Sequence, residues 1–408
     1  MSDKKSRYKK SILKQFYFSQ LLSCADLCDA MNKSLPLITK LINELIVEGK
    51  VIETGYAPST GGRRPTMYSL KPDIQYVVAV SMDQLITRIV LMDMQNNYVG
   101  EVEKMDTPLA KTPSALTLLT EKIQDFIDRL AISKDKIAGI GITMPGFIDV
   151  QKGINYSFVY SPDGSISKHI AKAVGLPVFI ENDSSAIALA ELRFGAAVNQ
   201  KNVMVINMGW GVGLGLILDG ELYRGESGFA GEFSHIPIFN NNKLCGCGKT
   251  GCLETETSLL VLVEKAIEEL EKGRRSSIAG VSIEKPEEAY NTIIQSALAG
   301  DQLAVELLSD VGFKIGRGLA ILIHLLNPKL IILSGRGSSA GRIWQAPIQQ
   351  ALNEYCIPRL AQNTIIKVSD LGFKAELIGA ATMVMENFET IKESKSGLLT
   401  EKMHHSNE

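Results

Sequence analysis

The chain has 408 residues, which predicts two to four domains at about 100–200 residues per domain. Charged residues make up 22% of the sequence and hydrophobic residues 45%, both ordinary for a folded protein. The net charge of −2 hides an asymmetry, because residues 1–72 carry 12 Lys and Arg against 6 Asp and Glu, whereas the remainder carries 31 against 39. A basic head on an acidic body is typical of a protein whose head binds nucleic acid.

The sequence excludes several classes of protein. No run of about 18 apolar residues is present, so we expect no transmembrane helix. The basic residues after Met1 are not followed by an apolar segment with a cleavage site, so we expect no signal peptide and a cytoplasmic location. Six cysteines are too few for a disulfide scaffold, and three of them, within eight positions, indicate a metal site instead.

The basic head has the pattern of three helices and a β-hairpin. Ser23 and Ser34 are each placed to cap a helix, Pro36 fits a first helical turn, and Gly49 ends the third helix. The expected elements are helices at 7–18, at 25–31 and between Ser34 and Gly49, and strands at 51–53 and 67–70. This order predicts a winged helix-turn-helix.

Two parts of the head are candidate DNA contacts. The exposed face of the third helix offers Thr, Lys and Asn, which are residue types that contact base edges or phosphates. The loop between the two strands holds two arginines on a glycine stem, which suits insertion into a narrow minor groove. The alternative is a small interaction domain with a solvated basic face. The predicted DNA contacts are Leu37, Thr39, Lys40, Asn43, Arg63 and Arg64.

From about residue 73 strand and helix patterns alternate, which predicts an α/β body. Strands are expected at 76–80, 88–92, 137–143, 178–181, 203–207, 215–218 and 330–333. Helices are expected at 112–130, 184–194, 258–273 and 287–325. We find no short-period internal repeat, and the polar tail after about Asn387 is expected to fray.

The segment Glu181-Asn182-Asp183 ends one expected strand and opens the next helix. Ligands bind at strand ends of open α/β sheets, and a carboxylate beside an amide can hold a polyhydroxylated ligand. The carboxylate could also act as a general base toward a ligand hydroxyl. Helix capping by Asn182 or Asp183 is the alternative, and it needs no ligand.

A glycine-rich segment, Met208 to Gly215, lies between two expected strands. Its alternating glycines allow backbone N–H groups to approach a phosphate. The alternative is a glycine-rich hairpin that binds nothing.

A third candidate site combines His235 with Cys245, Cys247 and Cys252. Structural zinc takes four tetrahedral nitrogen or sulfur ligands, and a Cys₃His set meets that need. The alternative is three reduced thiols and an unrelated histidine. Glu254 follows closely after the last cysteine and places a carboxylate beside the predicted Zn²⁺ loop.

Together these motifs resemble the ROK family (repressors, open reading frames, kinases) over nearly the whole chain. The most specific is the run from Cys245 to Glu254 preceded by Gly231-Glu232 and His235, although Ser234 replaces the usual glycine before the histidine. The resemblance implies a winged helix-turn-helix followed by an actin-like ATPase (ribonuclease H-like) duplicated α/β body. It also implies that His235 is a zinc ligand close to the sugar and that Asp183 occupies the position of the kinases' general base. The sugar-binding residues that it implies are Asn182, Asp183, Glu232, His235 and Glu254.

One departure from the kinases bears on function. ROK kinases open the body with Asp-x-Gly-Gly-Thr, which cradles ATP phosphates, whereas the matching stretch here is Val80 to Leu85 and has neither glycine. Side chains there would block the backbone approach that a triphosphate needs. The second phosphate loop, Gly209 to Gly215, and Gly335-Arg336-Gly337 are retained. The chain therefore keeps only half of the residues of an ATP site, which we interpret as an inherited remnant.

The leading hypothesis is a sugar-responsive transcriptional repressor, a homodimer or a dimer of dimers, with no catalytic residue. It would bind operator DNA through the head and a sugar or sugar phosphate in the body. The alternatives are an ATP-dependent sugar kinase with a DNA-binding appendage and a regulator whose body binds a protein partner. The expected domains are 1–72 (winged helix), 73–194 (first α/β lobe), 195–390 (second lobe with the zinc loop) and 391–408 (polar tail).

Overall fold

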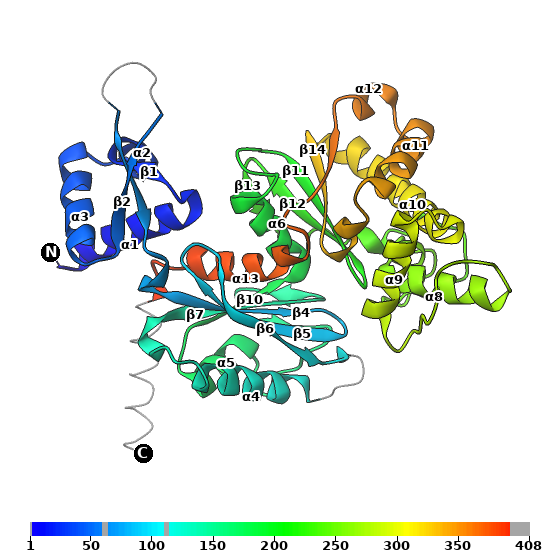
Figure 1. The fold of residues 1–408 in the computed structure, drawn as a ribbon, viewed down its shortest axis with the longest axis horizontal. Helices are drawn as coiled ribbons and strands as arrows, with labels where there is room; N and C mark the ends of the chain where they lie inside the picture. Colours follow the sequence, from blue (N-terminus) through cyan, green and yellow to red (C-terminus); the bar gives the residue numbers. More distant parts are fainter. Residues whose placement is uncertain (1, 59–63, 110–113, 392–408) are drawn as a thin grey trace. The chain divides into compact units, whose positions relative to one another are not determined.

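The computed structural model describes residues 2–58, 64–109 and 114–391 (Figure 1). The chain forms two compact units. The first unit runs to Asp183 and resumes at Leu377, and the second unit is Ser184–Glu376. In the described part of the chain no helix is long and apolar enough to cross a membrane.

The basic head belongs to the first unit and contains three helices and a small antiparallel sheet of order β1-β3-β2 (Figure 1). Its elements are α1 (Ser2–Ser19), β1 (Leu22–Ser23), α2 (Cys24–Met31), α3 (Leu35–Val47), β2 (Val51–Tyr56) and β3 (Thr66–Leu70). Apolar side chains at helical spacing form its core, among them Phe16, Leu27 and Ile38, all fully buried.

The two expected serine caps behave differently. Ser23 Oγ accepts the Asp26 N–H at 3.2 Å, and the Asp26 carboxylate accepts the Ser23 N–H at 2.8 Å, which makes a capping box. Ser34 stands at the N-cap position of α3, as expected, but its side chain accepts no capping hydrogen bond. Pro36 lies in the first turn of α3, where the missing N–H leaves no donor to satisfy.

A five-stranded sheet of order β10-β7-β4-β5-β6 forms the first lobe. Its strands are β4 (Tyr76–Met82), β5 (Ile86–Asp93), β6 (Tyr98–Asp106), β7 (Ile137–Met144) and β10 (Val178–Asn182). β4, β5 and β6 form an antiparallel meander, whereas β7 and β10 add in parallel. Side chains of α4 (Ala115–Asp128) and α5 (Ile166–Val174) share one apolar core with the sheet.

The other face of this sheet is covered by α13 (Ala375–Glu386) (Figure 1). Gly139 and Gly141 alternate along β7 with isoleucines that join the core with α4 and α5. A Cβ on Gly141 would lie 2.0 Å from the Ala380 carbonyl oxygen, so glycine at this position lets α13 pack directly on the strand.

A second five-stranded sheet, of order β13-β12-β11-β14-β15, lies in the second unit. Its strands are β11 (Val203–Met208), β12 (Val212–Leu218), β13 (Glu221–Tyr223), β14 (Leu330–Ser334) and β15 (Ile365–Val368). The helices of this unit are α6 (Asp183–Phe194, which begins one residue earlier), α7 (Glu254–Thr257), α8 (Leu259–Glu271), α9 (Pro286–Leu298), α10 (Gln302–Leu326), α11 (Gln345–Tyr355) and α12 (Pro358–Ala361).

The two sheets share one topology. In each, three consecutive strands form an antiparallel meander and two later strands add in parallel beside the first. This internal duplication confirms the predicted fold class of the body.

Some expected elements differ from the structure. The single helix expected at 287–325 is two helices, because Gly300 has φ +88° and the Asp301 carboxylate caps α10 by accepting the Ala304 N–H. β12 begins at Val212 rather than 215, so two glycines of the predicted loop lie inside a strand. β6, β13, β15, α5, α11 and α13 were not predicted, nor was the short hairpin of β8 (Ile148–Asp149) and β9 (Ile154–Asn155).

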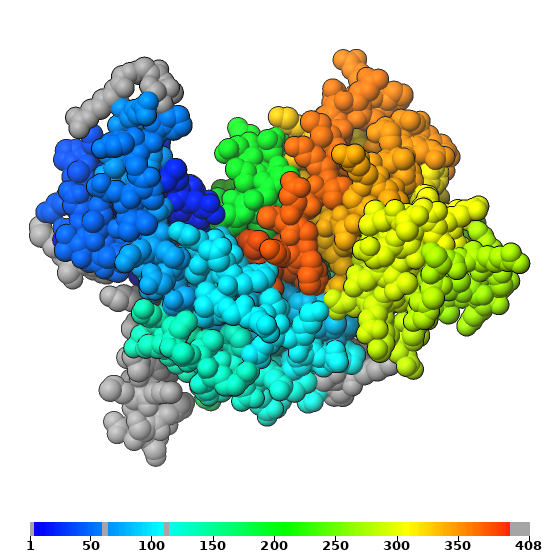
Figure 2. Space-filling view, in the orientation of Figure 1, coloured from blue at the N-terminus to red at the C-terminus, as the bar shows by residue number. Residues whose placement is uncertain are grey.

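Side chains of α1 join the head to the rest of the first unit, where Figure 2 shows the blue head against the cyan lobe. Lys14 Nζ donates to the Glu386 carbonyl at 2.7 Å, and Lys10 Nζ donates to the Phe388 carbonyl at 3.4 Å. The Tyr17 hydroxyl donates to Asn96 Oδ1. The head therefore contacts the C-terminal end of α13, where cations complement the helix carbonyls.

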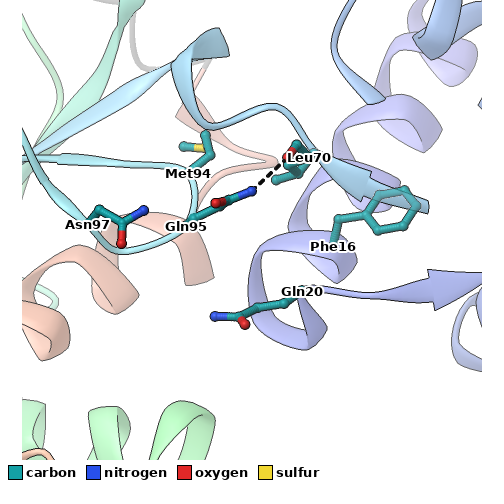
Figure 3. Close-up of a pocket in the computed structure, with 6 residues that line it drawn as sticks. All are labelled: Phe16, Gln20, Leu70, Met94, Gln95 and Asn97. Carbon is teal, nitrogen blue, oxygen red and sulfur yellow. Dashed lines mark hydrogen bonds between the residues drawn. The ribbon is translucent and has the colours of Figure 1, made fainter. Parts of the chain in front are cut away.

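A cavity of about 340 Å³ lies at this joint (Figure 3). Its lining residues are Phe16, Gln20, Leu70, Met94, Gln95 and Asn97. The Gln95 side-chain amide donates to the Leu70 carbonyl at 3.1 Å across it. None of the predicted sugar or metal residues lines this cavity, so it is separate from the sites described next.

Candidate functional site

Asn182 and Asp183 lie where β10 ends and α6 begins, at the carboxyl end of the first sheet, and both are partly exposed. Asn182 Nδ2 donates to the Gly146 carbonyl at 3.2 Å. The Gly146 backbone has φ +94°, and a Cβ there would lie 2.5 Å from Ser157 Cβ. Asn182 therefore lies against the glycine turn that follows β7, at a sheet edge where ligands bind in open α/β folds.

The segment after that turn carries exposed aromatic side chains that were not predicted as a site. Phe147, Tyr156, Phe158 and Tyr160 are 38–80% exposed. The sequence signal was available, since an aromatic residue stands at every second position from 156 to 160 in a chain with only 6% aromatic residues.

In the second unit the structure brings the four predicted metal ligands together. Their ligand atoms all lie within 4.8 Å of one another. His235 Nδ1 lies 3.4 Å from Cys245 Sγ, and Cys247 Sγ lies 3.6 Å from Cys252 Sγ. A Zn–S bond of about 2.3 Å implies sulfur–sulfur edges of about 3.8 Å in a tetrahedron, so this group fits a zinc ion.

Local backbone geometry explains why these residues converge. Cys245 N donates to the Lys249 carbonyl at 2.8 Å, and Gly248 N donates back to the Cys245 carbonyl at 2.9 Å, which closes a tight knuckle. Gly251 has φ +78°, and a Cβ there would lie 2.2 Å from the Phe239 carbonyl oxygen. Burial and the neighbouring thiols raise the pKa of Cys252 to about 12, so this side chain needs a bound cation to be held as a thiolate near neutral pH.

Two carboxylates flank this cluster. Glu232 Oε2 lies 3.6 Å from His235 Nε2, on the ring edge opposite the thiols, as expected for a carboxylate that orients a metal-bound histidine. Glu254 Oε2 accepts the Val212 N–H at 3.2 Å. Burial raises the pKa of Glu232, with His235 opposing and Glu254 adding to the shift. The structure thus brings together Glu232, His235 and Glu254, three of the five predicted sugar-binding residues.

The first turn of the body is closed by the Asp83 carboxylate. Asp83 Oδ1 accepts the N–H groups of Leu85 and Ile86, both at 2.8 Å, and Asp83 Oδ2 pairs with Arg88 Nη1 at 3.0 Å. Arg88 is only 1% exposed. The carboxylate therefore closes a tight β4–β5 hairpin, a role that sequence reasoning missed.

The retained glycines of the second turn have packing roles. A Cβ on Gly213 would lie 1.9 Å from Ser184 Oγ, and one on Gly215 would lie 2.3 Å from Ala188 Cβ. Glycine at these positions lets α6 pack against β12. A Cβ on Gly337 would likewise lie 2.5 Å from Met208 Cβ. The glycines thus need no bound phosphate to explain them.

An aromatic–cation stack lies beside this turn. The Arg336 guanidinium carbon lies 4.7 Å from the Trp210 ring centre and 4.5 Å from that of Phe373. Arg336 also pairs with Glu287 at 3.1 Å, and Trp210 packs edge-on against Tyr290. This cluster, which the sequence did not predict, fills the surroundings of Gly335-Arg336-Gly337 with the chain's own side chains.

In the head, Thr39, Lys40 and Asn43 are exposed on α3, and Arg64 is exposed two residues before β3. Leu37 is half-buried, so its side chain is less available than expected. Arg63 lies outside the described residues. The exposed set presents the residue types that DNA backbones and base edges accept.

Duplicated sheets with a histidine–cysteine cluster in the second lobe define the body as an actin-like ATPase-type fold. The model of the ROK family matches residues 78–387, and the chain belongs to the ROK family.

Three relatives define the similarity further. The chain is 29% identical over 388 residues to the xylose repressor of Caldicellulosiruptor bescii, covering 92% of this chain and 94% of the repressor. It is 31% identical over 292 residues to the glucokinase of Halalkalibacterium halodurans, covering 70% of this chain and 88% of the kinase. A solved ROK family transcriptional regulator, a homologue of the Escherichia coli Mlc protein, aligns with a TM-score of 0.73 at 28% identity, covering 92% of this chain and 94% of the regulator.

Proposed function

We propose that the protein is a sugar-responsive transcriptional repressor, cytoplasmic and active as a homodimer or a dimer of dimers. The observation that carries the proposal is the extent of the similarity to regulators. A match over 92% of the chain must include most of the 72-residue head, whereas the glucokinase match covers 70%. A head shared with repressors supports operator binding as the output of the protein.

In this proposal the head is a winged helix-turn-helix that binds operator DNA. α3 enters the major groove with Leu37, Thr39, Lys40 and Asn43, and the wing contributes Arg63 and Arg64. The exposure of Thr39, Lys40, Asn43 and Arg64 supports this assignment.

The effector is a sugar or sugar phosphate. We assign its hydroxyl contacts to Asn182 and Asp183 in the first unit and to Glu232, His235 and Glu254 in the second. Zinc held by His235, Cys245, Cys247 and Cys252 has a structural role, because four protein ligands leave no position for a catalytic water. It fixes the loop that carries Glu232 and the start of α7, which carries Glu254.

A repressor without kinase activity is supported by the two turns of the body. The Asp83 carboxylate accepts hydrogen bonds within a tight hairpin, and the glycines of the second turn allow α6 to pack against β12. The alternative, a sugar kinase with a DNA-binding appendage, rests on the glucokinase similarity. A body that binds a protein partner in place of a sugar is the third possibility.

A path of contacts within the first unit supports coupling between sugar and operator. Asn182 contacts the turn after β7, α13 packs on β7, and α1 of the head contacts the end of α13. A ligand that binds two arrangements of this path unequally shifts their populations and thus the operator affinity.

The direct test uses the full-length protein and a DNA fragment that it selects from a random pool. We expect tight binding that weakens with salt, and release by one class of sugar. That sugar stabilises the fold by about 2.7 kcal/mol at 100 times its Kd. Arg64→Ala is expected to shallow the salt dependence by about one unit, and the exposed Arg275→Ala in the second unit leaves it unchanged. A protein that selects no DNA is not a repressor.

A further inference from the structure

The segment between β7 and α5 exposes an aromatic surface formed by Phe158 and Tyr160. β8 and β9 pair at Ile148–Asn155 and Asp149–Ile154, and Ile148 and Val159 are buried in the lobe's core. Val159 is 2% exposed, whereas the aromatic rings on either side of it reach the surface. Phe158 is 39% exposed and Tyr160 is 80% exposed.

Hydrogen bonds fix the backbone of this surface. The Asn155 side chain is 5% exposed, donates to the Pro145 carbonyl at 3.1 Å and accepts the N–H groups of Ser157 and Phe158 at 2.8 and 3.0 Å. Ser157 Oγ accepts the Phe147 N–H at 2.9 Å. The aromatic rings are therefore exposed on an ordered support, and not on a loose loop.

The aromatic surface continues directly from Asn182. The Asn182 amide donates to Gly146, the residue before Phe147, so hairpin and sugar contact share one turn. The Phe158 ring lies at the same turn, because a Cβ on Gly146 would stand 3.0 Å from Phe158 Cδ2. The exposed rings and the Asn182 amide therefore border one turn of the chain.

Sugar rings have two kinds of surface. Their edges carry hydroxyls, which suit Asn182 and Asp183, and their C–H faces are apolar, which suits exposed aromatic rings. We propose that the effector carries a second sugar ring, which lies on Phe158 and Tyr160. The first ring is then the one that contacts Asn182 and Asp183. This inference rests on the proposed sugar-responsive function and names the effector class as a disaccharide or its phosphate.

The test measures binding to the full-length protein by calorimetry. The probes are glucose, xylose and N-acetylglucosamine, each paired with disaccharides that contain it. We expect one disaccharide to bind about tenfold more tightly than its component sugar, comparable to stacking on one aromatic side chain. Tyr160→Ala is expected to remove most of this preference, and Tyr160→Phe, which keeps the ring, to retain it.

Tyr223→Ala is the matched control, because Tyr223 is 49% exposed on β13 and is outside the hairpin. Phe158→Ala provides a second variant if Tyr160→Ala loses its cooperative unfolding. Equal affinities for a sugar and its disaccharides, or a preference that survives both alanine variants, would overturn the inference and leave the proposed function standing. A protein that binds DNA and no sugar at all would overturn both. If Tyr160→Ala loses the regulatory response but keeps its sugar affinity, the aromatic surface binds a protein partner. That result would also overturn the inference of a second sugar ring.

Discussion

The two lobes have the same strand order, yet their first turns are built in opposite ways. The turn after β4 is closed by a carboxylate, since Asp83 accepts two backbone N–H groups and pairs with the buried Arg88. The turn after β11 is open and glycine-rich, and the strand that follows it uses glycine to bring α6 close. One topology therefore carries two different turn chemistries.

This difference shows how a glycine-rich sequence typical of phosphate loops can be present in a protein that binds no phosphate there. The glycines of β12 are required by packing, so they would be retained whether or not a phosphate binds. The first turn contains no glycine, and the Asp83 carboxylate closes it as a tight hairpin. Function must therefore be argued from each site, because the shared topology does not settle it.

The largest effect is expected from the metal cluster, which only the second lobe carries among the described residues. We expect about one zinc per chain in protein purified without chelator, and Cys252→Ser to lose it together with several kcal/mol of stability. Cys356→Ser, in the same unit, keeps the metal. Elemental analysis and urea unfolding measure both effects, and zinc-free wild-type protein would contradict the assignment.

The carboxylate of the first turn is the next test. Asp83→Ala removes one partner of a buried ion pair and two backbone hydrogen bonds, so it should lower the free energy of unfolding by about 3 kcal/mol. Asp163→Ala, whose carboxylate is 60% exposed, is the control. Similar unfolding midpoints for the two variants would show that the first turn does not depend on Asp83.

Alanine substitutions in the second turn separate packing from phosphate binding. Gly215→Ala places a Cβ 2.3 Å from Ala188 Cβ, and overpacking of this kind should cost about 2 kcal/mol. Gly209→Ala meets nothing nearer than 3.6 Å and should change the free energy of unfolding by less than about 0.5 kcal/mol. If both variants lose the same free energy of unfolding, the glycines of β12 are not required for the packing of α6.

A smaller effect concerns pH. Glu256 in the second lobe is 7% exposed and accepts hydrogen bonds from Lys265 and Lys314 at 3.0 and 2.7 Å. Burial opposes ionisation, but these lysines and Lys243 outweigh it and lower the pKa of Glu256 to about 2. Because the folded pKa lies below the unfolded value near 4.5, the stabilisation is full above about pH 4.5 and disappears as the pH falls toward 2.

Glu256→Gln should therefore lower stability at pH 7 by about 1–2 kcal/mol and flatten the acid limb of a stability–pH curve. The exposed Glu288→Gln, whose side chain is 71% exposed, serves as control. An unchanged acid limb in Glu256→Gln would contradict the role of this carboxylate.

Local signals in the sequence predicted much of the fold. The Ser23 cap and the buried stripe of α3 follow from side chains that act within one helical turn. The split of the helix at 287–325 was missed because its break depends on the backbone conformation of Gly300. Strand β6 was missed because its side chains are largely exposed and leave no apolar alternation.

The candidate metal site was predictable because its ligands are concentrated in the sequence and glycines mark its turns. The Asp83–Arg88 hairpin and the Trp210–Arg336–Phe373 stack were not, since a single sequence does not reveal which charges or rings meet across a fold. For the same reason the glycines of β12 were read as a phosphate loop, although their neighbours on α6 explain them.

The most direct test of the central claim measures operator release and ADP formation in one titration of the full-length protein with ATP and the effector sugar. The account predicts that the sugar releases the operator without forming ADP. It also predicts that Asp183→Ala retains operator affinity and no longer responds to the sugar. ADP that forms only when that sugar is present, and is lost in Asp183→Ala, would contradict the account and make the protein a sugar kinase that also binds DNA.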